Sequence, residues 1–439
     1  PQFNGDSLRS ALRAHGIRYE HLSDLGGLRR ARKDSRNTGW RNASFRGFAD
    51  YMLTAGFETG LAGLRALTAK GRVALMCAEA VPWRCHRSLV ADALTARGAQ
   101  VEHIIGSSRP TPHHLTTFAK VAGARVTYPG EESERLITRA PFHLEATVRV
   151  LQRRPANRVD VWEQNRYRRV LTTADGLVLV EVENRGTVDD PDVRLAIRSG
   201  NPSAATRLEI GRTVRKVLGL DVDPVPLQAL VEGERKLRPT ALALRGMRPP
   251  RFAGLFEAFV NVVPFQQLSL DAGIAIVGRL VERLGKRLEE GDRRFDAFPT
   301  SRAIGDARLD ALRACGLSRS KAESLRSLAR AMESGELTEE RISGMSTSDA
   351  LKTLAELPGI GPWSAGVVLL RGLGRIDVFP PGDVGAMRGL SALLRLRRAQ
   401  SFDRVVDRFG EHRGYLYFYA LGGNLLARGL IGAAPTDVV

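Results

Sequence analysis

A tight turn between two apolar helical segments constrains this chain more than any other feature of its sequence. Residues 357–365 read Leu-Pro-Gly-Ile-Gly-Pro-Trp-Ser-Ala. Glycine adopts positive φ without steric cost, so we expect Gly359 and Gly361 to let the chain reverse sharply between two helices. The helix before the turn carries a capping signal, because Ser346 is followed three positions later by Asp349. The amides that open the second helix would then point outward and could hold an anion such as a phosphate group.

A single acid follows the second helix after a proline-rich turn. Residues 378–384 read Val-Phe-Pro-Pro-Gly-Asp-Val, which puts Asp383 directly after a rigid segment. An aspartate in this position is an ordinary N-cap for the next helix. The same carboxylate could also stand at the mouth of a cleft and take part in a reaction. The two roles are compatible.

These motifs carry a family resemblance. The segment from about 250 to 430 resembles the helix-hairpin-helix DNA glycosylases, whose pattern is Leu-Pro-Gly-Ile-Gly and then, one helix later, a catalytic aspartate. The likeness is strongest to the 3-methyladenine DNA glycosylase II type. Members of the endonuclease III type, which also cut the strand, carry a Schiff-base lysine two residues past the last hairpin glycine, where this chain has Trp363. The resemblance therefore implies a monofunctional hydrolase of base excision repair that releases alkylated purines and leaves an abasic site.

The resemblance also assigns the chemistry and the base-flipping role. Asp383 would be the catalytic carboxylate, stabilising the positive charge that develops on the sugar as the base leaves. A stacked base must be extruded from the duplex before it can react. Alignment on Ser269 makes Gln267 the side chain that fills the gap. Leu268 is the substitute if the loop is one residue out of register, since apolar wedges are also common.

The flipped base should meet aromatic walls, because an electron-deficient alkylated base gains from stacking and cation–π attraction. The resemblance nominates Trp363, Tyr415 and Phe142, although Phe142 could equally be a packing residue. The residues expected to grip DNA are those of the hairpin: Leu357, Gly359, Ile360, Gly361 and Ser364. We expect no organic cofactor and no metal centre. The resemblance allows a monovalent cation on the hairpin carbonyls. The alternatives are a glycosylase for another damaged or hypermodified base and a non-catalytic damage-binding module.

The chain divides into three expected domains. Residues 1–128 alternate helical and strand-like segments and predict an α/β domain, with a short buried strand at 73–77 and a helix over 85–97. Residues 137–222 predict a small antiparallel sheet with flanking helices, like the domain that precedes the glycosylase helices in the 3-methyladenine type. Residues 223–439 are nearly all helical in pattern and form the helix-hairpin-helix domain.

Charge and cysteine content agree with a DNA partner. The formal net charge is +18 and the isoelectric point is near 10.6, which implies an anionic partner, although arginine-rich composition also occurs without a DNA role. Residues 1–128 contain 19 Lys and Arg against 9 Asp and Glu, and the remainder is basic as well. Three cysteines without paired spacing indicate a reducing compartment. We expect a cytoplasmic, nucleoid-associated monomer that binds double-stranded DNA.

A second group of reactive residues lies in the first domain: Cys77, Glu79, Cys85, His86 and Arg87. A thiol at a helix start can be activated, and an arginine beside it can bind an anion. As a zinc site the group looks poor, because two of its three ligand residues are adjacent. A purely structural Cys77 is the simplest alternative.

With the stretches around Tyr19 and Trp40, these residues resemble the domain of unknown function 488 family over about 1–120, which carries no established activity. Members of that family begin with a strand and a helix ahead of the stretch that is residues 1–4 here, so the resemblance suggests a late start. We hypothesise that this basic domain contacts DNA beside the lesion through its arginines. The candidates are Arg29, Arg30, Arg41, Arg46 and Arg87.

Overall fold

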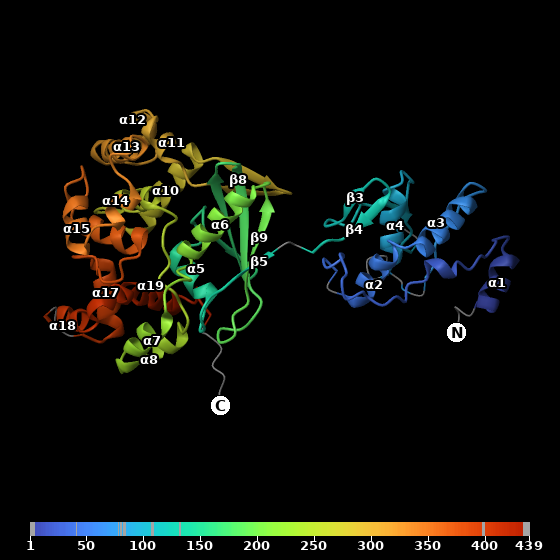
Figure 1. Cartoon of the computed structure of the whole chain (residues 1–439), viewed down its shortest axis with the longest axis horizontal. Coiled ribbons are helices and arrows are strands. Elements are labelled where there is room, and N and C mark those ends of the chain that lie inside the picture. Colours follow the sequence, from blue (N-terminus) through green and yellow to red (C-terminus); the bar gives the residue numbers. More distant parts are fainter. Residues whose placement is uncertain are drawn as a thin grey trace. The chain divides into compact units, whose positions relative to one another are not determined.

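The computed structural model describes residues 5–40, 42–77, 79, 81, 85–106, 109–130, 133–396 and 400–432. The chain forms two compact units, Pro1–Glu132 and Ser133–Val439 (Figure 1). Among the described residues, every helix is too short or too polar to cross a membrane.

The first unit packs helices and two short hairpins around a small core. Its helices are α1 (Gly5–Ala14), the 3-10 turn η1 (Ser23–Leu25), α2 (Ala43–Tyr51), α3 (Ala55–Thr68) and α4 (Arg87–Thr95). The hairpins pair β1 (Glu102–His103) with β2 (Thr111–Pro112) and β3 (Lys120–Ala122) with β4 (Arg125–Thr127). Phe48, Leu61, Leu89 and Tyr128 lie at the centre of the core and are almost fully buried. The α/β character of this unit is confirmed.

The strand expected at 73–77 is absent from the structure. Residues 72–77 have no regular secondary structure, and Val73 and Met76 are 41% and 53% exposed. A strand forms only where a neighbour takes up its backbone hydrogen bonds. The described strands of this unit pair only within their own hairpins. The apolar run therefore lacks the sheet that would bury it, whereas the helix expected after it forms as α4.

A buried carboxylate joins α4 to the hairpins. Asp92 accepts hydrogen bonds from the Thr116 hydroxyl at 2.7 Å and the Tyr128 hydroxyl at 2.8 Å, and it lies 2.8 Å from Nε2 of His113. Burial raises the pKa of Tyr128 far above its usual value, and the charge of Asp92 adds to the effect. These bonds fix the segments that carry Thr116 and Tyr128 to α4, because breaking one would take a partner away from a buried charge.

The second unit begins with a five-stranded antiparallel sheet. Its strands are β5 (Ser133–Leu136), β6 (Val161–Glu163), β7 (Arg166–Thr173), β8 (Gly176–Asn184) and β9 (Val193–Ser199), in the order β5-β9-β8-β7-β6. Helices α5 (Leu144–Gln152) and α6 (Ala204–Val217) lie beside the sheet (Figure 1). Leu151 of α5 and Val214 of α6 share one hydrophobic cluster with Val180 of the sheet.

The rest of the second unit is mostly helical and contains the predicted helix-hairpin-helix turn. Its helices are α7 (Pro224–Gly233), α8 (Arg238–Ala243), α9 (Leu255–Val260), η3 (Val263–Phe265), α10 (Leu270–Leu284), α11 (Ser301–Gly305), α12 (Leu309–Arg313), α13 (Arg319–Glu333), α14 (Glu339–Ser343), α15 (Thr347–Ala355), α16 (Pro362–Val367), the π-helix η4 (Val368–Leu373), α17 (Val384–Leu393), α18 (Gln400–Arg408), η5 (Gly410–His412) and α19 (Tyr415–Ala427). Strands β10 (Arg287–Glu290) and β11 (Arg293–Asp296) form a hairpin that interrupts them. The sheet and helices α9 to α16 share one core cluster, and α7, α8, α17, α18 and α19 pack in a second. Both clusters lie within a single compact unit.

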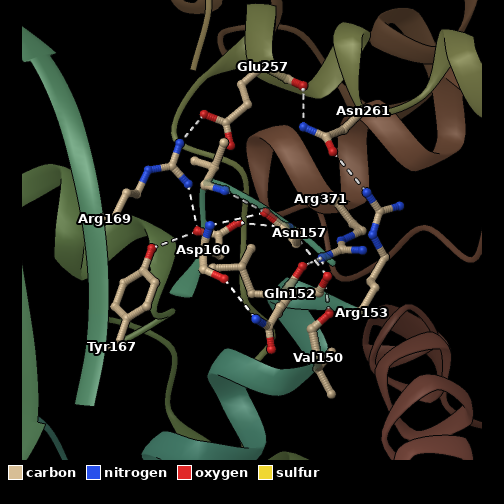
Figure 2. A network of polar contacts seen from close by, with 12 residues as sticks. Val150, Gln152, Arg153, Asn157, Asp160, Tyr167, Arg169, Glu257, Asn261 and Arg371 are labelled. Carbon is tan, nitrogen blue, oxygen red and sulfur yellow. Dashed lines mark hydrogen bonds and ion pairs between the residues drawn. The ribbon is translucent and has the colours of Figure 1, made fainter. Parts of the chain in front are cut away.

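A buried polar network fastens the sheet to the helices (Figure 2). Arg169 of β7 donates to Asp160 at 2.8 Å and also pairs with Glu257 of α9. Tyr167 donates to the same Asp160 oxygen at 2.9 Å. Removing one member of a buried ion pair costs about 3–5 kcal/mol, because the other charge stays behind without a partner. The network therefore fixes the orientation of the sheet against the helical part of the unit.

Candidate active site

The predicted hairpin forms between α15 and α16. Gly359 has φ +78°, and a Cβ on it would lie 2.1 Å from Oγ of Ser324 on α13. Gly361 has φ −91° and serves as the N-cap of α16, and apart from its chain neighbours no atom of the described residues lies within 4 Å of the place a Cβ would take. The expectation of positive φ is confirmed for Gly359 and is wrong for Gly361. The reversal needs only one left-handed residue, because Gly361 already enters the helix in an extended conformation.

The hairpin exposes backbone and buries its side chains. Ile360 is 3% exposed and packs in the main core cluster, with Leu357 partly buried against the same cluster. Ser364 is also buried, whereas Gly359 and Gly361 are exposed. The first amides of a helix have no partner within the helix. Of the five residues predicted to grip DNA, the two glycines therefore expose backbone to solvent, while the side chains of Ile360 and Ser364 anchor the turn.

A residue that the sequence did not single out ties this hairpin to the loop before α10. Nε2 of Gln266 donates to the carbonyl of Gly359 at 2.7 Å and to Oγ of Ser364 at 2.9 Å. The ammonium of Lys321 donates to the carbonyl of Gln266 at 2.6 Å. The two adjacent glutamines at 266 and 267 were the only hint in the sequence. They did not indicate which glutamine binds the hairpin and which is exposed as a wedge.

The predicted wedge residues stand at the end of that loop. Gln267 is exposed and has φ +57°, an uncommon conformation for a residue with a side chain. Leu268 is 46% exposed, and Ser269 caps α10 through its hydroxyl. Strained backbone of this kind occurs often at functional sites. Both wedge candidates are therefore accessible, and they are held in place by the cap on one side and by Gln266 on the other.

Asp383 fulfils its predicted structural role and lies against Trp363. Its Oδ1 caps α17 by accepting from the amide of Ala386 at 2.8 Å, and its Oδ2 accepts from Nε1 of Trp363 at 2.9 Å. Both side chains are partly exposed. Gly366 permits this approach, because a Cβ there would lie 3.0 Å from Cα of Pro380. The proline turn thus packs directly on α16 and brings the carboxylate to the indole.

Buried polar groups lie behind this pair. Tyr417 is 7% exposed, and burial raises its pKa, with the negative charge of Asp383 as the next cause. Tyr417 also interacts with the guanidinium of Arg371, which is fully buried and donates to the carbonyl of Val150 at 3.4 Å. Tyr417 therefore feels the charges of both a carboxylate and a buried guanidinium.

A second buried arginine accompanies Arg371. Nη2 of Arg153 donates to Oδ1 of Asn261 at 2.8 Å (Figure 2). Burial, and then the charge of Arg371, lower the pKa of Arg153 to about 9, so it still carries its proton at neutral pH. Its guanidinium also lies over the ring of Phe265, 4.4 Å from the centroid. This arginine thus packs beneath the segment that leads into the wedge loop.

The other two predicted pocket aromatics pack in the core. Tyr415 is 3% exposed, its hydroxyl donates to the carbonyl of Met247, and burial raises its pKa to about 12. Phe142 is fully buried, with Arg248 over its ring at 5.6 Å. The structure therefore unites Trp363 and Asp383 but places neither ring beside them as an open wall. Helix α19 is buried along most of its length, and all four aromatics of its first five residues pack inside.

Most of the basic residues proposed as DNA contacts in the first unit already have partners. The guanidinium of Arg29 lies 4.0 Å from the ring centre of Tyr51, and Nε of Arg46 donates to the carbonyl of Trp40 at 3.1 Å. Nε of Arg87 donates to Sγ of Cys85 at 3.3 Å, Arg30 is exposed, and Arg41 lies outside the described residues.

Comparison with known sequence families assigns three segments of the chain. Residues 260–409 match the HhH-GPD superfamily base excision DNA repair proteins, residues 134–253 match the AlkA N-terminal domain, and residues 1–94 match a domain of unknown function, DUF488. A DNA-3-methyladenine glycosylase of Bacillus subtilis is 30% identical over 216 residues, which cover 48% of this chain and 71% of that protein. DNA-3-methyladenine glycosylase 2 of Escherichia coli is 35% identical over 138 residues, covering 31% and 48% of the two chains.

Solved structures show the same architecture. The 3-methyladenine DNA-glycosylase from Archaeoglobus fulgidus superposes with a TM-score of 0.56 at 26% identity, covering 67% of this chain and 99% of that one. The 8-oxoguanine glycosylase/lyase of Clostridium acetobutylicum, solved with double-stranded DNA, gives a TM-score of 0.52 at 16% identity, covering 68% and 99% of the two chains. The second likeness shows the fold alone.

Proposed function

The chain belongs to the DNA-3-methyladenine glycosylases, DNA N-glycosylases of base excision repair, and on that basis we propose that it hydrolyses alkylated purines from double-stranded DNA without cutting the strand. The observation that carries this proposal is the contact between Asp383 and Trp363 next to the hairpin. An indole stands where a strand-cutting relative needs a lysine, so no Schiff base can form at this position.

Asp383 and Trp363 have different roles at the glycosidic bond. As the bond to the base lengthens, positive charge grows on the sugar, and the carboxylate of Asp383 lowers the energy of that state. Water then adds to the sugar carbon, and its proton leaves with the base or passes to solvent. The indole N–H of Trp363 fixes the carboxylate, while the exposed part of its ring offers a surface on which a cationic alkylated base can stack.

The hairpin and the wedge loop position the DNA around this pair. The exposed backbone of Gly359 and Gly361 faces outward at the start of a helical run, where amides attract a phosphate group. Gln267, or Leu268 beside it, fills the space left by the flipped nucleotide. We propose no organic cofactor. A monovalent cation on the hairpin carbonyls stays a prediction, and Gln266 already occupies the carbonyl of Gly359. We place the enzyme in the reducing cytoplasm as a monomer.

Replacing Asp383 by asparagine tests the catalytic assignment. Asparagine is as good an N-cap as aspartate, so α17 should stay capped while the negative charge disappears. We expect single-turnover release of alkylated purines from duplex DNA to fall about 100- to 1000-fold, the usual effect of losing one electrostatic stabiliser. Binding of the same duplex should be unchanged.

The matched control is Asp223→Asn, which removes a charge from the N-cap of α7, where the carboxylate accepts from the amide of Val225. This variant should release bases at the normal rate. Mass spectrometry of bases freed from a panel of damaged duplexes identifies the substrate in the same experiment. Undiminished release by Asp383→Asn would contradict the assignment, and release of an oxidised or hypermodified base alone would favour the alternative substrate class.

A further inference from the structure

A cluster of soft ligand atoms lies in the first unit. Sγ of Cys77, Sγ of Cys85 and a ring nitrogen of His86 all lie within 4.8 Å of one another. The separation between Sγ of Cys85 and Nδ1 of His86 is 3.6 Å. The adjacency of these two residues, which argued against a metal in the sequence, therefore does not keep their ligand atoms apart. The helix start turns both side chains to the same side.

The imidazole is held in a prepared position. Gly27, far away in sequence, lies so close that a Cβ on it would meet Nδ1 of His86 at 2.2 Å. The ring of Phe48 packs against the imidazole, with the two ring centres 4.9 Å apart. A backbone hydrogen bond to Leu25 orients the ring further. Metal-binding histidines are commonly fixed in this way by a second hydrogen bond to a backbone carbonyl.

The spacing of the ligand atoms fits a tetrahedral ion. With Zn–S bonds of about 2.3 Å and Zn–N bonds of about 2.0–2.1 Å, tetrahedral angles separate sulfur from nitrogen by about 3.6 Å and sulfur from sulfur by about 3.8 Å. The Cys85–His86 distance of 3.6 Å matches the first value. The remaining separations, within 4.8 Å, need to shorten by at most about 1.0 Å between the sulfurs and about 1.2 Å between Cys77 and His86, which a side-chain rotation supplies.

The surroundings also suit bound thiolates. Cys85 is 2% exposed, and it accepts a hydrogen bond from Nε of Arg87 at 3.3 Å and from the backbone amide of the same residue at 3.5 Å. Donors of this kind stabilise the negative charge of a metal-bound sulfur without touching the metal themselves. Two thiolates balance the charge of a divalent ion, and the guanidinium can hold an anionic group near it.

We propose that Cys77, Cys85 and His86 together bind one thiophilic divalent metal ion, Zn²⁺ being the best match, with the fourth coordination position open to water or an exogenous ligand. Two sulfurs and an imidazole select zinc over magnesium or calcium, which require oxygen. Three protein ligands are typical of zinc sites that act on a substrate, whereas structural sites use four. Glu79 is the one carboxylate in the sequence between the two cysteines. On binding, the two thiol protons are released to solvent.

Cobalt provides a direct test, because a thiolate-bound tetrahedral Co²⁺ ion absorbs strongly in the near ultraviolet and visible range. The full chain is first stripped of metal with a chelator under reducing conditions. It should then bind one equivalent of Co²⁺ and develop a charge-transfer band in the near ultraviolet and a second band in the visible range. Cys77→Ser, Cys85→Ser and His86→Ala should each lose them. The matched control is Cys315→Ser, which alters a buried cysteine of the other unit and should leave the spectrum unchanged.

A second measurement needs no variant and guards against misfolding. Loading with Zn²⁺ should slow alkylation of Cys77 at least tenfold, a chelator should restore the original rate, and Cys315 should be unaffected. The proposal is overturned if the unaltered chain shows no charge-transfer band, if the band survives Cys85→Ser, or if the two cysteines are recovered as a disulfide in place of a bound metal.

Discussion

The two hairpin glycines provide a matched pair of substitutions with opposite expected outcomes. Gly359 combines φ +78° with a hypothetical Cβ 2.1 Å from Oγ of Ser324, while Gly361 has φ −91° and open space around it. Gly359→Ala should therefore destabilise the larger unit. Gly361→Ala should leave the fold intact but place a methyl group where the duplex would approach.

The size of the first effect follows from two contributions. A left-handed conformation costs a residue with a Cβ about 1–2 kcal/mol. The overlap with Ser324 adds about 1–3 kcal/mol, the usual cost of an extra methyl group in a packed site. Gly359→Ala should thus lose about 2–5 kcal/mol of unfolding free energy. In Gly361→Ala, alanine lowers the conformational entropy of the unfolded chain, which stabilises the fold, but it is a weaker N-cap than glycine. The two effects oppose each other, so the free energy of unfolding should change by no more than about 1 kcal/mol.

Calorimetric unfolding of the full chain measures these changes through the transition of the larger unit. Adding Ser324→Ala to Gly359→Ala removes the nearest clashing atom and should recover part of the overlap contribution, since Cβ of residue 324 would still lie 2.8 Å away, and none of the left-handed one. Titration with a duplex containing an abasic site should show weaker binding by Gly361→Ala. Equal stability losses for the two single variants, or none for Gly359→Ala, would refute the reasoning.

Three further predictions concern neighbouring contacts. Trp363→Phe keeps a ring but removes the donor to Asp383, a charge-assisted bond of about 1.5–3 kcal/mol, so single-turnover excision should fall about 10- to 100-fold with DNA affinity retained. Gln266→Ala removes two hydrogen bonds of about 0.5–1.5 kcal/mol each and should lower both stability and excision, whereas Gln267→Ala should lower excision alone. His143 has a pKa lowered by burial, and its ring accepts from the amide of Ala146. Acidification below the unfolded pKa of about 6.5 should therefore destabilise the protein, and His143→Asn, which keeps the cap without titrating, should show a smaller loss between pH 7.5 and 5.5 in denaturant unfolding.

Much of the helical framework could be predicted because its signals are local. The range 319–333 matches α13, and Ser346 caps α15 as its spacing with Asp349 indicated. The hairpin β10–β11 was missed because its strands are mostly charged, and only Leu288 and Phe295 face each other as an apolar pair. The prediction of a strand at 73–77 was wrong although the segment is apolar. An apolar run does not show whether a neighbouring strand exists to pair with it.

The candidate site was predictable only in part. Asp383 and Trp363 follow from the motif and from the resemblance it carries, and their contact confirms that the hairpin and the proline turn meet. The hydrogen bonds of Gln266 join residues about a hundred positions apart, so no local pattern could reveal them. The burial of Tyr415 and Phe142 depends on neighbours supplied by several helices, which composition does not specify.

The attachment of both Asp383 oxygens has a consequence for how lesions are chosen. One oxygen is fastened to the start of a helix and the other to an indole, so the acid has no freedom to reach toward a poorly seated sugar. On the proposed mechanism, the nucleic acid then has to deform until the anomeric carbon of the flipped nucleotide reaches this fixed carboxylate. Nucleotides with weak glycosidic bonds and loosened stacking would reach that position most easily. A fixed carboxylate would therefore favour lesions that make the duplex easy to deform.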